Sequence, residues 1–179
     1  MASSLEKLQK NYDVEIHWRS FMLRPPGSPP IPPEYRARIE ASHTQLEKMA
    51  REQYGLELHP GPFGIDSRPA LIAAKYAESQ GKGNAFHAAG MHAYWQEGRS
   101  IDDPEVLREI AASVGLETEH FAATNPEYSA EVDEDMAEAN AYGLQAVPAL
   151  IFAEKYLLSG AQPYELLVQV VEKLQKEGV

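Results

Sequence analysis

The sequence contains no cysteine, and this absence excludes several kinds of site. Without Cys among its 179 residues, the chain has no disulfide framework, thiolate zinc site, iron–sulfur cluster or thiol nucleophile of its own. Positive charge is also scarce, since 16 Lys and Arg stand against 27 Asp and Glu for a net charge of −11. This balance argues against a nucleic-acid partner and against an anionic membrane surface.

Long apolar runs are missing as well. The longest, Ala146 to Ala153, contains Pro148 and is too short to cross a bilayer. Charged residues are scattered through residues 1–20, where a signal peptide needs an apolar stretch. We therefore expect a cytoplasmic protein of one domain, or of one domain with a sizeable insertion.

The period of the apolar residues changes early in the chain. Apolar residues at positions 5, 8 and 12 have helical spacing, and Ser3 and Ser4 are candidate N-caps for this first helix. Residues 14–18 instead alternate and are rich in β-branched and aromatic side chains, which predicts a strand. The side chains expected on its buried face are Val14, Ile16 and Trp18.

A proline-rich stretch and a block of helices follow. Six of the 13 prolines lie between positions 25 and 33, which indicates a stiff connector and a domain boundary. Helical spacing then continues for about a hundred residues, with Gly, Asp and Pro at the helix ends. We predict helices over residues 35–54, 67–80, 85–97, 103–112 and 127–142, and a short helical turn over 117–121.

Strand spacing returns near the end of the chain. Residues 149–152 form an apolar run typical of a buried strand, 154–155 a tight turn and 156–159 the partner of a hairpin, before a last helix over 163–176. The front strand and the hairpin must share one sheet. We therefore predict an α/β domain from residues 1–27 and 140–179, with an all-helical insertion at 28–139.

Four stretches support a family resemblance: residues 16–25 (IHWRSFMLRP), 97–103 (EGRSIDD), 142–149 (YGLQAVPA) and 159–163 (SGAQP). In their order and spacing, the chain resembles the DsbA family and, within it, the FrnE-like branch. The resemblance implies a thioredoxin-like fold with a large inserted helical domain. It also implies a thiol–disulfide oxidoreductase or isomerase that acts on peptide or protein substrates without a cofactor.

The sequence departs from this family at its start. In the family, a strand and a Cys-x-x-Cys motif precede the first helix, whose N-terminus lowers the pKa of the attacking thiol. Here residues 1–8 resemble the part of that helix after the motif, so no residue is assigned a catalytic role and the chain as given is expected to be redox-silent. A Cys-x-x-Cys in the reading frame upstream of Met1 is the observation that restores the redox hypothesis.

The resemblance assigns one substrate-binding position. Only about 5–6% of X-Pro bonds in folded proteins are cis, but the family keeps the proline that matches Pro148 in the cis form, opposite the cysteine pair. There the backbone of the preceding residue pairs with an extended substrate peptide. The resemblance therefore implies that Val147 and Pro148 bind the substrate.

Three other groups of residues have less specific interpretations. His87 and His92 are five residues apart, whereas ligands on one helix face are three or four apart, so we predict no metal site. The third predicted helix is rich in large apolar side chains, which line either a groove or, as we expect, the core of the helical block: Phe86, Met91, Tyr94 and Trp95. The acidic residues between positions 127 and 138 are expected to form a solvated helix face.

Two alternative functions stay open. One is a redox-dead module that binds peptides or a protein partner. The other is a glutathione-dependent isomerase of the kappa-transferase or hydroxychromene-carboxylate type, in which a serine at the start of the first helix binds the thiolate. We expect Ser3 and Ser4 to act as caps instead, and residues 159–163 resemble the FrnE-like branch more than this one.

The resemblance also leads to an expectation about assembly. In the family fold, the strand that the sequence lacks lies centrally, so its absence leaves a slot lined by Val14, Ile16, Leu150 and Phe152. Either the two strands beside the slot pair directly, or another chain fills it. We expect a homodimer through this region.

Overall fold

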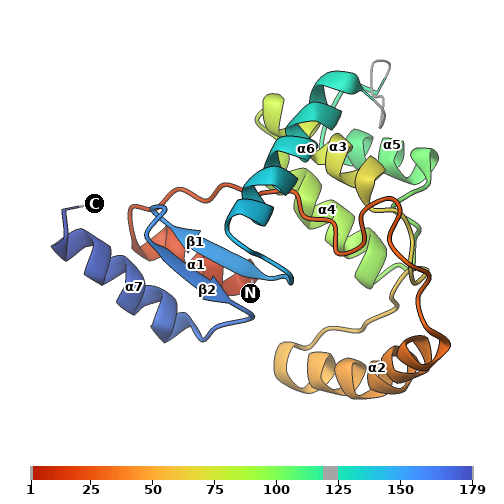
Figure 1. Cartoon of the computed structure of the whole chain (residues 1–179), viewed down its shortest axis with the longest axis horizontal. Coiled ribbons are helices and arrows are strands. Elements are labelled where there is room, and N and C mark those ends of the chain that lie inside the picture. The colour runs from red at the N-terminus through yellow and green to blue at the C-terminus, as the bar shows by residue number, and fades with distance from the viewer. Residues whose placement is uncertain (1, 119–124, 179) are drawn as a thin grey trace. The chain divides into compact units, whose positions relative to one another are not determined.

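The computed structural model describes residues 2–118 and 125–178. The chain forms two compact units, residues 1–23 with 135–179 (unit 1) and residues 24–134 (unit 2). These units reflect how the residues pack and do not by themselves define domains. The domain borders predicted after residues 27 and 139 therefore stay predictions. The elements of Figure 1 are, in chain order, α1 (Ala2–Asn11), α2 (Pro33–Tyr54), α3 (Arg68–Ser79), α4 (Gly83–Trp95), α5 (Pro104–Ser113), α6 (Pro126–Ala141), β1 (Ala149–Phe152), β2 (Tyr156–Ser159) and α7 (Tyr164–Lys176).

Unit 1 contains the predicted hairpin. β1 and β2 are antiparallel with Ile151 opposite Leu157, and both strands have the predicted bounds. The turn is one residue longer than predicted, because it begins at Ala153. Ala153 and Glu154 have φ of 47° and 56°, and the Lys155 N–H donates to the Phe152 carbonyl at 2.9 Å. Two successive left-handed residues are typical of a tight hairpin turn of type I′.

The strand predicted over residues 14–18 is not present. These residues are extended but belong to no ladder. Their burial nevertheless alternates as predicted, with Val14, Ile16 and Trp18 half-buried and the residues between them exposed. A strand needs a hydrogen-bonded neighbouring strand as well as an apolar face, and the sheet of the described residues consists of β1 and β2 alone. The alternation therefore predicted the buried face correctly and the pairing wrongly.

The core of unit 1 joins both ends of the chain. Leu5 and Leu8 of α1 pack with Leu167 and Val171 of α7, and the hairpin and the extended segment add half-buried side chains around them. Burial of each large apolar side chain contributes about 1.5–3 kcal/mol. Ser3 and Ser4 lie inside α1 rather than before it, so the capping role expected of them is wrong. The residues packed around the core are Tyr12, Val14, Ile16, Trp18, Leu150, Phe152, Leu158, Tyr164 and Val168.

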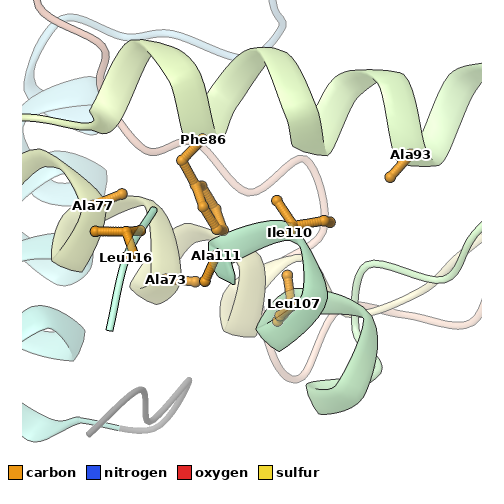
Figure 2. Close-up of a cluster of buried hydrophobic side chains, with 8 residues drawn as sticks. All are labelled: Ala73, Ala77, Phe86, Ala93, Leu107, Ile110, Ala111 and Leu116. Atoms are coloured by element: carbon orange, nitrogen blue, oxygen red, sulfur yellow. The ribbon is translucent and has the colours of Figure 1, made fainter. Parts of the chain in front are cut away.

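Unit 2 is helical, as predicted, and its core lies among α3, α4 and α5. Figure 2 shows Phe86 of α4 directed toward Ala111 of α5, within a cluster that also includes Ala73, Ala77, Ala93, Leu107, Ile110 and Leu116. Asp103 caps α5, because its carboxylate accepts the Glu105 N–H at 2.9 Å. Of the helical turn expected at 117–121, Glu117 and Thr118 are not helical and the rest lies outside the described residues.

The helices end within about two residues of their predicted bounds. Positive φ at Gly55 ends α2, since glycine adopts this conformation without a steric penalty. None of the helices in the described ranges is both long enough and apolar enough to cross a membrane.

Candidate functional site

The outer edge of β1 carries backbone groups that do not face β2. The Gly160 N–H donates to the Pro148 carbonyl at 2.8 Å, and bonded pairs alternate along an antiparallel ladder. In the observed register, Leu150 and Phe152 therefore direct their backbone groups toward β2. Ala149 and Ile151 direct theirs toward the opposite edge of β1.

That edge is open in the part of the chain that the structure describes. The sheet has two strands there, and neither Ala149 nor Ile151 makes a backbone hydrogen bond to another described residue across this edge. Val147, with a relative exposure of 50%, and Ile151, at 38%, add apolar surface. The Val147–Pro148 peptide bond is cis. Both residues that the resemblance assigned to substrate binding thus lie at the start of an open strand edge.

The turn after β2 fixes this end of the hairpin. Gly160 has a φ of 79°, which favours glycine, and its N–H makes the bond to Pro148. The Gln162 side chain donates to the Ser159 carbonyl at 2.6 Å. The stretch 159–163 therefore holds the residues at the start of β1 in place.

A buried carboxylate holds the chain directly after the extended segment of unit 1. Asp135, in the C-terminal half of α6, is only 4% exposed and accepts the Ser20 N–H at 2.6 Å. Arg19 reaches Asp135 at 3.4 Å and Glu138 at 3.4 Å. The solvated face predicted for the acidic residues is therefore wrong at Asp135. The position of Asp135 in the sequence could have indicated its burial. Asp135 lies three residues after buried Val132 and four before buried Ala139, on the apolar side of the helix.

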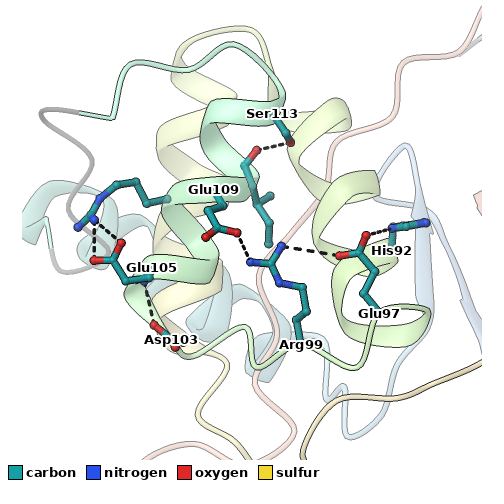
Figure 3. Close-up of polar contacts among 9 residues, drawn as sticks. His92, Glu97, Arg99, Asp103, Glu105, Glu109 and Ser113 are labelled. Carbon is teal, nitrogen blue, oxygen red and sulfur yellow. Dashed lines mark hydrogen bonds and ion pairs between the residues drawn. The ribbon is translucent and has the colours of Figure 1, made fainter.

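A second polar cluster lies in unit 2, beside a pocket of about 320 Å³ between α4 and α5. Figure 3 shows its chain of contacts: Arg99 bonds Glu109 and lies 3.7 Å from Glu97, and Glu97 lies 3.3 Å from the His92 ring. One guanidinium is thus shared by two carboxylates, and these three groups together carry an excess of negative charge. The cluster joins the C-terminal end of α4 to α5, and it was not predicted as an interacting group, although residues 97–103 were singled out.

The histidines of α4 lie in different surroundings. His87 is half-buried, and this burial lowers its pKa below the ordinary value of 6.5. His92 is exposed and pairs with Glu97. Within residues 2–118 and 125–178, no three His, Cys, Asp or Glu side chains form a group suited to a metal ion.

The large apolar side chains of α4 divide between core and surface. Phe86 lies in the core, as predicted, whereas Met91 is exposed, so the core assignment is wrong there. Tyr94 and Trp95 are half-buried and pack edge to face, with ring centroids 5.1 Å apart. They cover the end of α4, where the Tyr94 hydroxyl donates to the Pro62 carbonyl at 3.1 Å.

The hairpin, the helices around it and the inserted helical unit define the class of protein. A profile of the DSBA-like thioredoxin domain matches residues 1–172, so the chain belongs to this family. The predicted DsbA family and fold class are thereby confirmed, whereas the FrnE-like branch stays a prediction.

Individual relatives extend the match over almost the whole chain. The uncharacterized protein YwbO of Bacillus subtilis (strain 168) is 26% identical over 98% of this chain and 90% of its own length. A probable DsbA oxidoreductase from Streptomyces coelicolor has a TM-score of 0.80 at 24% identity, covering 98% of this chain and 83% of that one. A 2-hydroxychromene-2-carboxylate isomerase has a TM-score of 0.72 at 20% identity, covering 96% and 85%. At such identities, the two solved structures establish the fold alone.

Proposed function

We propose that the chain binds extended peptide segments along the open edge of β1, starting at Val147 and Pro148, and that it carries out no thiol–disulfide exchange by itself. The observation that supports this proposal is the orientation of the backbone of Ala149 and Ile151, whose N–H and C=O groups point away from β2. An extended peptide satisfies such groups by adding a strand.

The edge offers two kinds of contact to a peptide. Main-chain hydrogen bonds to Ala149 and Ile151 supply affinity with little dependence on the peptide's sequence. The exposed side chains of Val147 and Ile151 favour apolar residues in the peptide. The ligand class is therefore an unfolded or extended segment with apolar side chains.

The two reactions that the family resemblance implies require more than these residues supply. Disulfide exchange begins with attack by a thiolate and passes through a mixed disulfide, and the 179 residues include no cysteine. The glutathione-dependent alternative needs a serine at the start of the first helix. Ser3 and Ser4 lie in the first turn of α1, but residues 159–163 resemble the FrnE-like branch more than this isomerase. Peptide binding is the part of the family's activity that the edge of β1 supports.

Two proline substitutions on opposite edges of the hairpin test the proposal. Ile151→Pro removes an outward N–H from β1, and Leu157→Pro removes one from the far edge of β2; neither N–H belongs to the ladder between the strands. The probe is reduced, carboxymethylated α-lactalbumin, a permanently unfolded chain, titrated while fluorescence anisotropy is recorded. We expect Ile151→Pro to weaken binding at least tenfold, or about 1.4 kcal/mol, and Leu157→Pro to leave it unchanged.

Circular dichroism of both variants checks that the hairpin still folds. Absence of binding by the unsubstituted chain, or equal losses in two folded variants, contradicts the proposal.

A further inference from the structure

Helix α2 lacks a close packing partner. It has 22 residues, yet it packs extensively against none of the other helices or strands in the described ranges. Of its described side chains, only Ala50 is buried. Its visible contacts are with the segment that follows it, where Arg36 lies over the Phe63 ring at 5.6 Å and Arg51 makes two 2.8 Å bonds to Glu57.

One side of α2 nevertheless has the pattern of a helix–helix interface. Tyr35, Ile39, Ser42, Leu46 and Met49 are separated by alternating steps of four and three residues, which align along a single seam. Tyr35 and Met49 are 44% and 43% exposed, and Ile39 and Leu46 are half-buried. An apolar seam of this length, in water, is the kind of surface that a second helix covers.

We propose that α2 pairs antiparallel with α2 of a second copy of this chain. In an antiparallel pair about a two-fold axis, Ile39 packs against Met49 of the second copy, and Leu46 packs against Ser42. This register overlaps the helices along nearly their full length. By symmetry each contact occurs twice.

Charge complementarity supports this occupant and this register. Arg38 and Glu52 flank the seam on the same side, one near each end of the helix. In the antiparallel register, Arg38 of each copy lies beside Glu52 of the other, so two opposite-charge pairs form. Arg38 lies over the Tyr35 ring at 5.0 Å and Glu52 is 3.9 Å from Lys48 within the chain. Such exposed pairs contribute little and exchange readily.

The hairpin region is a less suitable contact for a second copy. The side chains expected to line its slot, Val14, Ile16, Leu150 and Phe152, are half-buried against the core of their own unit. The open backbone edge beside them is the proposed peptide site. The α2 seam belongs to unit 2, shares no residue with that edge and offers exposed apolar side chains. We therefore place the dimer contact at α2.

Sedimentation velocity of the full chain between 1 and 100 µM tests the proposal. We expect a concentration-dependent dimer, and Met49→Glu is expected to weaken it at least tenfold, because the carboxylate enters the apolar seam. Thr44→Glu is the matched control. Thr44 is two residues from both Ser42 and Leu46 and therefore lies on the opposite side of the helix, so this substitution is expected to leave the dimer intact. Helical circular dichroism shows whether both variants remain folded.

A charge exchange supplies the more specific test. Arg38→Glu and Glu52→Arg each place like charges together and weaken the dimer, whereas the double variant restores it. Fourteen residues, or about 21 Å of helix, separate these positions, so restoration reports a contact between copies. A monomer at every concentration, a dimer unaffected by Met49→Glu, or a double variant no better than the single ones overturns the proposal.

Discussion

At the scale of single residues, the hydrogen bonds of Asp135 indicate a role in stabilising unit 1. Its carboxylate is buried and accepts the Ser20 N–H at 2.6 Å, and truncation leaves that N–H unpaired in the interior. We expect Asp135→Ala to lower the free energy of unfolding by about 1–3 kcal/mol, measured by urea denaturation. Glu138→Ala is the control, since its exposed contact with Arg19 is worth about 0–1 kcal/mol. Equal effects of the two substitutions are incompatible with this role.

His87 gives a pH dependence whose sign follows from its burial. Burial lowers the pKa of His87 in the folded chain below its ordinary value of 6.5, so the neutral ring is the form that folding favours. Its stabilising contribution is complete above pH 6.5 and is lost as the pH falls through the lower, folded pKa. We expect His87→Gln to reduce the loss of stability between pH 7 and pH 5, measured by urea unfolding across that range. An unchanged pH profile contradicts this assignment.

At the scale of elements, the hairpin turn is a place where the sequence does not suit the backbone. Glu154 has a φ of 56°, and a side chain in the left-handed region costs about 1–2 kcal/mol. Because glycine adopts this conformation freely but also gains freedom in the unfolded chain, Glu154→Gly should stabilise unit 1 by about 0.5–1 kcal/mol. Thermal unfolding followed by circular dichroism measures the change.

The neighbouring residue provides the control for the turn. Lys155 is not among the residues of positive φ, so Lys155→Gly adds flexibility without relieving strain and should not stabilise the hairpin. A gain in both variants, or in neither, contradicts the explanation by backbone conformation.

The elements also explain which parts of the fold the sequence could reveal. Helices α3 and α5 were predictable because prolines, glycines and the Asp103 cap mark their ends, and local rules are sufficient for such signals. The prediction of a strand at residues 14–18 was wrong because strand pairing depends on a second segment elsewhere in the chain. The periodicity of one segment carries no information about that partner. The assignment of Val147 and Pro148 to substrate binding comes only from the family resemblance and stays a proposal. The outward backbone of Ala149 and Ile151 required the observed ladder.

At the scale of the whole molecule, family membership and composition lead to opposite expectations for redox activity. The chain belongs to the DSBA-like thioredoxin domain family, and two of its structural relatives are named as an oxidoreductase and an isomerase. A catalyst of disulfide exchange needs a thiolate that attacks and a second thiol that releases the mixed disulfide. No residue among the 179 is a cysteine, so the fold is present without the group that performs the reaction.

We therefore expect this polypeptide to leave the rate of insulin reduction by dithiothreitol at its uncatalysed value. The measurement is the onset of turbidity as the insulin B chain precipitates, with a heat-denatured sample of the same chain as the baseline and a Cys-x-x-Cys thioredoxin as the positive control. Peptide binding at β1, as proposed above, delays precipitation without accelerating reduction, so samples are also quenched with iodoacetamide and the released, alkylated B chain is measured by chromatography. Release of B chain above the denatured baseline means that the chain promotes reduction by a route that needs no thiol of its own.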